Sequence, residues 1–230
     1  MLDRVPDRLP DRVPRWGDRR RIRVGLLGGS FNPAHAGHLH IARIALARLR
    51  LHQVWLMVSP GNPLKAPVGM ARFTDRMASA LALADGRRIV ATSIEARMGT
   101  RYTFMTLRAL RRRFPRIRFV WIMGADNLVQ LPRWQRWVDI VRATPCAVMP
   151  RPTYNQRALA SQAVQRLRRA LLPARSAPTL ALRHPPAWTF LPARQNGLSA
   201  TSLRATQGLT WPPHHAMVDA ILSKDRRHSP

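Results

Sequence analysis

The residues of this 230-residue chain that are best placed to do chemistry lie in the stretch GLLGGSFNPAHAGHLH, residues 25–40. Two glycines follow an apolar run there, and three histidines come next. Glycines let backbone amides approach a ligand, and a helix that starts near Gly37 would direct its free N–H groups and positive dipole end at the same space. The stretch therefore predicts an anion site, in which His35 and His38 donate hydrogen bonds to phosphate oxygens.

A metal centre is the alternative interpretation of these histidines. Zinc sites need three or four ligands with partners behind them. The histidines beyond residue 40 show no ligand spacing, and the single cysteine, Cys146, excludes an internal disulfide and a cysteine-based zinc site. The sequence therefore predicts no metal ligands in the chain. His40 is expected to be structural or exposed, because it lies on another face of the helix.

The elements that must position these residues alternate between strands and helices. Strands are expected over 21–27, 53–59, 88–94, 118–124 and 146–150, and helices over 37–51, 72–84 and 104–114. Strands separated by helices of this length imply right-handed crossovers. The expected fold class is therefore α/β, a Rossmann-like doubly wound parallel sheet with helices on both faces. Such a sheet binds its ligand at the carboxyl ends of the strands, and Gly28 and Gly29 are expected to follow the first strand there.

The two ends of the chain differ from this pattern. An Asp-Arg-x-Pro repeat occupies residues 3–14, and proline at every fourth position prevents a regular helix or strand. We expect a disordered Arg/Asp/Pro leader over 1–21, one domain over 22–222 and a flexible tail over 223–230.

The charge of the chain is strongly positive. The formal net charge is +28, but only two of the 39 basic residues are lysine. The arginines are dispersed along the expected helix faces, which is typical of a solvated surface. The sequence therefore predicts no specific nucleic-acid partner and no membrane partner, and a non-enzymatic polyanion-binding protein remains a remote alternative. The absence of a signal segment or a long apolar run predicts a cytoplasmic protein.

Two motifs resemble those of the nucleotidylyltransferase superfamily. Its (H/T)-x-G-H motif is similar to His35-Ala36-Gly37-His38, within GGSFNPAHAGHLHIA. Its S-x-T-x-x-R motif is similar to LSATSLR, which supplies Ser199, Thr201 and Arg204. Class I aminoacyl-tRNA synthetases share a related first motif, but their lysine-rich second motif is missing here.

Three middle segments resemble the bacterial nicotinate-nucleotide adenylyltransferases, which join nicotinate mononucleotide and ATP into deamido-NAD. They are PGNPLK (60–65), the run from 95 to 107, and GADNLVQLPRWQRW (124–137). The resemblance covers roughly residues 22–210. Many relatives have Pro-Pro-His-Lys where this chain has Asn-Pro-Leu-Lys, so the role of Lys65 stays open.

The resemblance implies a site with two halves and magnesium bound through the ATP phosphates. The residues expected to act in catalysis are His35, His38 and Arg204. The residues expected to bind ATP are Gly28, Gly29, Ser30, Phe31, His35, His38, Lys65, Ser199, Thr201 and Arg204. The residues expected to bind the mononucleotide are Asn32, Tyr102, Thr103, Asp126 and Trp134.

Alternatives remain for several of these residues. Thr103, Asp126 and Ser199 could simply cap helices, while Trp121 and Trp137 are expected to pack in the core. The acceptor could also be nicotinamide mononucleotide or another phosphorylated compound. A mononucleotide phosphate is already a nucleophile, so the reaction needs positioning and charge stabilisation rather than clustered carboxylates.

Overall fold

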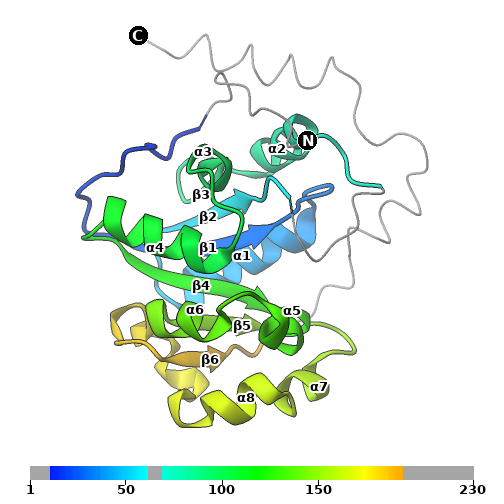
Figure 1. Ribbon diagram of the computed structural model, residues 1–230, viewed down its shortest axis with the longest axis vertical. Helices are drawn as coiled ribbons and strands as arrows, with labels where there is room; N and C mark the ends of the chain where they lie inside the picture. The colour runs from blue at the N-terminus through cyan, green and yellow to red at the C-terminus, as the bar shows by residue number, and fades with distance from the viewer. Residues whose placement is uncertain (1–10, 62–68, 194–230) are drawn as a thin grey trace.

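The computed structural model describes residues 11–61 and 69–193, and six strands in this part of the chain form one sheet (Figure 1). All neighbouring strands are parallel, and their order is β3-β2-β1-β4-β5-β6. The strand order reverses between β1 and β4, which is where such sheets bind ligands. The fold class predicted from the sequence is confirmed. The strands are β1 (Arg23–Gly29), β2 (Gln53–Val58), β3 (Ile89–Thr92), β4 (Arg118–Gly124), β5 (Cys146–Met149) and β6 (Trp188–Phe190).

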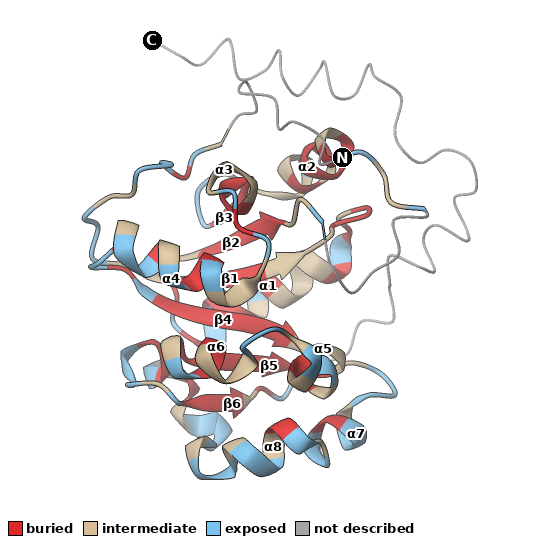
Figure 2. Ribbon diagram, viewed as in Figure 1, coloured by how far each residue is buried: buried red, intermediate tan, exposed pale blue. Residues whose placement is uncertain are grey.

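Helices cover both faces of the sheet, so the strands lie between two apolar layers (Figure 2). Side chains alternate along each strand: Leu26 of β1 joins one layer, and Leu27 joins the other. One face is covered by α1 (Ala36–Arg48), α2 (Phe73–Leu83) and the 3-10 segment η3 (Ala174–Leu182). The other is covered by α3 (Ile94–Arg97), α4 (Thr103–Arg113), α5 (Ala125–Gln130), η1 (Leu131–Arg133), α6 (Trp137–Ala143), α7 (Asn155–Leu159) and α8 (Gln162–Leu167), which η2 (Arg168–Ala170) follows.

The first strand ends two residues later than the sequence predicted. Gly28 and Gly29 pair with Met57 and Val58, so both glycines belong to β1 instead of following it. A side chain at Gly28 would come within 2.7 Å of the Trp121 ring. Glycine is therefore needed at this point of the strand to make room for an indole on the neighbouring strand.

Part of the expected leader lies against the body of the domain. Val13 is 1% exposed and joins the layer on the α4 side of the sheet. The segment then runs to the end of α4, where Arg113 lies 6.0 Å from the ring centroid of Trp16 (Figure 1). For residues 11–21 this differs from the expectation of disorder, because Asp11 and Val13 find buried partners that the repeat does not reveal. Among the described residues, no helix has the length and apolar character needed to cross a membrane.

Candidate active site

A cavity of about 350 Å³ opens at the carboxyl ends of β1 and β4. Its walls come from these strands, from α3 and from the starts of α4 and α5, so residues far apart in sequence meet there. Among its lining residues are seven that the sequence assigned to substrate binding: Gly28, Gly29, Ser30, Tyr102, Thr103, Asp126 and Trp134.

The start of α1 forms a second, smaller hollow, lined by His35, Gly37 and His38. His35 is the N-cap, and its Nδ1 accepts a hydrogen bond from the Gly37 amide at 3.1 Å. His38 Nδ1 accepts from the His35 amide at 3.2 Å. The two histidines thus make a reciprocal capping box, and their ring centroids lie 3.9 Å apart. His40 also lines this hollow, so it lies nearer the site than expected.

The capping bonds decide which ring nitrogens can donate to a ligand. A neutral imidazole whose Nδ1 accepts a hydrogen bond carries its proton on Nε2. Burial, together with the positive charge of Arg151, lowers the pKa of His35 to about 4. His35 is therefore a neutral donor at pH 7.

Arg151 was not expected from the sequence to belong to the site. It lies in the loop after β5, lines the hollow at the histidines and has its Nε 3.5 Å from Asp126 Oδ1. A basic residue directly after a strand end is the signal that identifies it. It supplies the positive charge that a neutral His35 lacks.

No described side chain caps the first turn of α4, and in this sense the start of the helix is open to a ligand. The N-cap of α4 is Tyr102, so the hypothesis that Thr103 caps this helix is wrong. In the described part of the chain the amides of Tyr102, Thr103 and Phe104 donate no hydrogen bond. Free amides at a helix start bind anions such as carboxylates.

Two indoles stand in the cavity wall. Trp121 and Trp134 meet edge to face, with ring centroids 6.5 Å apart. Trp121 is 5% exposed and belongs to the core, as expected, but it also lines the cavity. Trp137 packs against the same core layer, as expected.

Asp126 does not act as a helix cap. The N-cap of α5 is Gly124, and α5 has no side-chain cap in the described structure. Asp126 instead lines the cavity beside Asn127. Capping alone therefore does not explain this aspartate.

Glu95 is a site residue that the sequence reasoning missed. It is 9% exposed and lines the cavity, and its Oε1 accepts a hydrogen bond from Thr106 at 2.9 Å. Burial raises the pKa of its carboxyl, against the opposing effect of hydrogen bonds from Thr106 and Ser59. A glutamate three residues past the end of a buried strand, in a chain with few acids, is the signal that identifies it.

Phe31 and Asn32, two other residues expected to bind substrate, contact neighbouring protein groups in the structure. Phe31 is 1% exposed and packs on His38, with ring centroids 4.8 Å apart. The Asn32 amide holds the neighbouring loop: Nδ2 donates to the Gly69 carbonyl at 2.9 Å, and Oδ1 accepts from the Ala71 amide at 3.0 Å. Their contacts with substrate stay predictions. Four expected residues lie outside the described part of the chain: Lys65, Ser199, Thr201 and Arg204.

The described residues contain no group of three or more histidine, cysteine, aspartate or glutamate side chains that could hold a metal ion. The carboxylates that line the cavity are Glu95 and Asp126.

The strand order and the histidine-capped helix start define a nucleotide-binding α/β protein. The cytidylyltransferase-like family model matches residues 26–206. A probable nicotinate-nucleotide adenylyltransferase from Gluconacetobacter diazotrophicus is 61% identical over 191 residues, covering 83% of this chain and 89% of the relative. Another from Gluconobacter oxydans is 59% identical over 183 residues, covering 80% and 94%. The chain belongs to the nicotinate-nucleotide adenylyltransferase family, as its motifs predicted.

Solved structures of distant relatives share the fold. The Plasmodium falciparum nicotinic acid mononucleotide adenylyltransferase complexed with NaAD superposes with a TM-score of 0.61 at 13% identity, covering 89% of this chain and 96% of that one. The same enzyme complexed with APC gives a TM-score of 0.58. At this identity the likeness concerns the fold alone.

Proposed function

We propose that the chain transfers the adenylyl group of ATP to nicotinate mononucleotide, giving deamido-NAD and pyrophosphate. One observation carries this proposal: the open start of α4 and the indole of Trp134 line the same cavity. Nicotinate needs both features, because its carboxylate binds amides at a helix start and its electron-poor ring binds an aromatic surface. The curated names of the relatives agree with this chemistry.

The ATP half of the site lies at the start of α1. His35 and His38 donate from Nε2 to phosphate oxygens, and Arg151 adds positive charge beside them. Arg204 and Lys65 are proposed to hold the β- and γ-phosphates, with hydroxyl and amide donors from Ser199 and Thr201. Gly28, Gly29 and Ser30, which are also expected to bind ATP, line the larger cavity at the end of β1.

The mononucleotide half lies at the carboxyl ends of β1 and β4, where the strand order of the sheet reverses. The amides of Tyr102 and Thr103 receive the carboxylate, and Trp134 stacks on the pyridine ring. Arg101 and Arg133 also line this cavity and favour an anionic ligand. Because the raised pKa of Glu95 favours its neutral form, this side chain repels the carboxylate less than an ordinary glutamate would.

The chemical step joins two phosphates. An oxygen of the mononucleotide phosphate attacks the α-phosphorus of ATP. The bond between this phosphorus and the oxygen that bridges the α- and β-phosphates breaks, and pyrophosphate leaves with that oxygen. The nucleophile is already anionic, so no side chain has to remove a proton. The protein contributes in-line positioning and donors for the charge on the leaving group.

Magnesium is the expected cofactor, and its mode of binding follows from the carboxylates at hand. Asp126 lies beside Arg151, and Glu95 accepts a hydrogen bond from Thr106. Neither carboxylate is therefore a free anionic ligand for a metal ion. These residues fit a magnesium ion that is held by the ATP phosphates and by water. When bound, magnesium neutralises phosphate charge.

We also propose that the protein works in the cytoplasm. Its single cysteine, Cys146, is a free buried thiol, and burial raises the pKa of this thiol to about 12. Such a thiol is neither a nucleophile nor a disulfide partner, which suits a reducing compartment.

A pyrophosphate-release assay with ATP tests the proposed function. The expected result is a higher kcat/KM for nicotinate mononucleotide than for nicotinamide mononucleotide, because only the former carries a carboxylate for the start of α4. A higher value for the amide would overturn the substrate assignment. No pyrophosphate release with either acceptor, together with salt-sensitive binding to duplex DNA, would favour the polyanion-binding alternative.

A further inference from the structure

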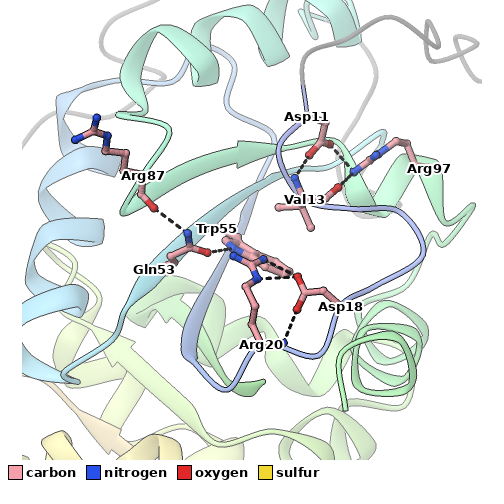
Figure 3. A network of polar contacts seen from close by, with 8 residues as sticks. All are labelled: Asp11, Val13, Asp18, Arg20, Gln53, Trp55, Arg87 and Arg97. Atoms are coloured by element: carbon pink, nitrogen blue, oxygen red, sulfur yellow. Dashed lines mark hydrogen bonds and ion pairs between the residues drawn. The ribbon is translucent and has the colours of Figure 1, made fainter. Parts of the chain in front are cut away.

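Asp11 in the leader is bound to the body of the domain at the end of β3, and Figure 3 shows its contact with Arg97. Its side chain is 2% exposed. The Oδ2 atom accepts hydrogen bonds from Thr92 Oγ1 at 2.9 Å, from the Ser93 amide at 2.7 Å and from Ser93 Oγ at 2.8 Å. It also forms an ion pair with Arg97 at 2.9 Å. A buried carboxylate with several charge-assisted donors is a strong anchor.

These contacts hold the one-turn helix α3 at both ends. Ser93 is the N-cap of α3 but makes no capping bond of its own, because its hydroxyl donates to Asp11. Arg97 is the last residue of α3, and its guanidinium reaches both Asp11 and the Val13 carbonyl. A helix of one turn has little stability in isolation. The position of α3 therefore depends on partners outside the helix, and Asp11 is a principal one.

The second residue of α3 continues this chain of contacts into the cavity. Glu95 lines the cavity wall and accepts a hydrogen bond from Thr106 of α4. The Thr106 hydroxyl lies 2.8 Å from that of Thr100 and 3.3 Å from the Tyr102 carbonyl. The Thr100 amide in turn donates to the Glu95 carbonyl at 3.2 Å. The loop that presents the open amides of α4 is thus tied to α3.

We propose that Asp11 is a positioning residue for the mononucleotide half of the site. It fixes α3, which through Glu95 and Thr106 holds the start of α4 in the orientation that receives the nicotinate carboxylate. Asp11 lies before residue 26, where the match to the family model begins, so this contact comes from outside the matched region. The inference rests on the proposed function.

The test compares steady-state kinetics of full-length Asp11→Ala, Asp11→Asn and the parent. Removing the anchor is expected to raise the KM for nicotinate mononucleotide about tenfold while the KM for ATP changes less than twofold, since a buried hydrogen-bond acceptor to charged and backbone donors is lost. Asp11→Asn keeps an acceptor oxygen but loses the ion pair with Arg97, so a smaller rise is expected.

Asp18→Ala is the matched control within the same segment. Asp18 bonds to Arg20 two residues away and, among the described residues, to nothing in the body of the domain (Figure 3). This variant is expected to keep both KM values. Equal changes in the two KM values of Asp11→Ala, or no change in either, would overturn the proposal, even if the melting temperature falls.

Amide hydrogen exchange without substrates separates this inference from the proposed function. Asp11→Ala is expected to exchange faster over residues 98–106 and at the parent rate over α1. Unchanged exchange over 98–106 would overturn the positioning role. If the parent protein turned over no nicotinate mononucleotide, the proposed function would fail, whereas the exchange result would still report on the contact between Asp11 and the loop.

Discussion

His35 and His38 cap α1 reciprocally, each using Nδ1 to accept a backbone amide, with bonds of 3.1 Å from Gly37 and 3.2 Å from His35. The helix start thus selects the tautomer of both rings and directs ligand donation to Nε2. A histidine pair that serves the helix through one nitrogen can serve phosphate through the other. The structural role of these histidines and their proposed catalytic role are therefore separable at the level of single atoms.

Replacing His35 by asparagine separates those two roles. The asparagine Oδ1 can occupy the place of Nδ1 and accept the Gly37 amide, but the variant has no donor in the place of Nε2. We expect kcat to fall about a hundredfold, as for other lost transition-state donors, with the free energy of unfolding unchanged within about 0.5 kcal/mol. Urea denaturation and pyrophosphate release measure the two effects. Loss of stability without loss of kcat would contradict the phosphate role.

The lowered pKa of His35 predicts how stability depends on pH. The pKa falls from 6.5 to about 4 on folding, so between these values the unfolded chain binds the extra proton. The free energy of unfolding should therefore decrease as the pH falls from 6.5 to 4. The slope of the free energy of unfolding against pH over this range should be smaller in His35→Asn than in the parent. Urea denaturation at several pH values measures this slope. An equal slope in both proteins would assign the effect to other groups.

Trp134 is expected to determine affinity for the pyridine ring. Trp134→Ala should raise the KM for nicotinate mononucleotide about tenfold, because it removes both ring contact and buried apolar surface, and should leave the KM for ATP within twofold. Trp134→Phe retains an aromatic surface and should recover most of the loss. Parallel increases of both KM values would indicate collapse of the cavity instead of a lost stacking partner.

Gly28 and Trp121 form a size-matched pair across β1 and β4. A methyl group at position 28 would lie 2.7 Å from the indole, and the ring is rigid. Gly28→Ala should therefore lower the free energy of unfolding by about 1–3 kcal/mol, the usual cost of overpacking. Trp121→Phe in the same protein should restore part of this loss, and a double-mutant cycle by urea denaturation measures the coupling. Additive effects would show that the two positions do not interact.

Local patterns predicted much of the central fold. Alternating apolar strands and amphipathic helices placed β1, β2, α2, α4 and β4 within a few residues of their observed bounds. The short elements α3, α5 and β6 were missed because three to six residues carry too little periodicity to be distinguished from a loop. The carboxyl end of β1 was also placed two residues too early, since glycine is normally a weak strand former and only the neighbouring Trp121 explains Gly28 in the strand.

The sequence by itself determined the chemistry: the histidine pair, the second motif and the middle segments identify the family, because each needs particular residue types at particular spacing. Only the tertiary structure decided which of those residues meet. It brought Glu95 and Arg151 to the site, opened the start of α4 by making Tyr102 its N-cap, and bound Asp11 to Arg97 across more than eighty residues of chain. The physical reason is that burial and partner choice depend on the packing of distant segments. That packing converts a proline-rich repeat into a buried anchor and changes the pKa values of histidine and glutamate.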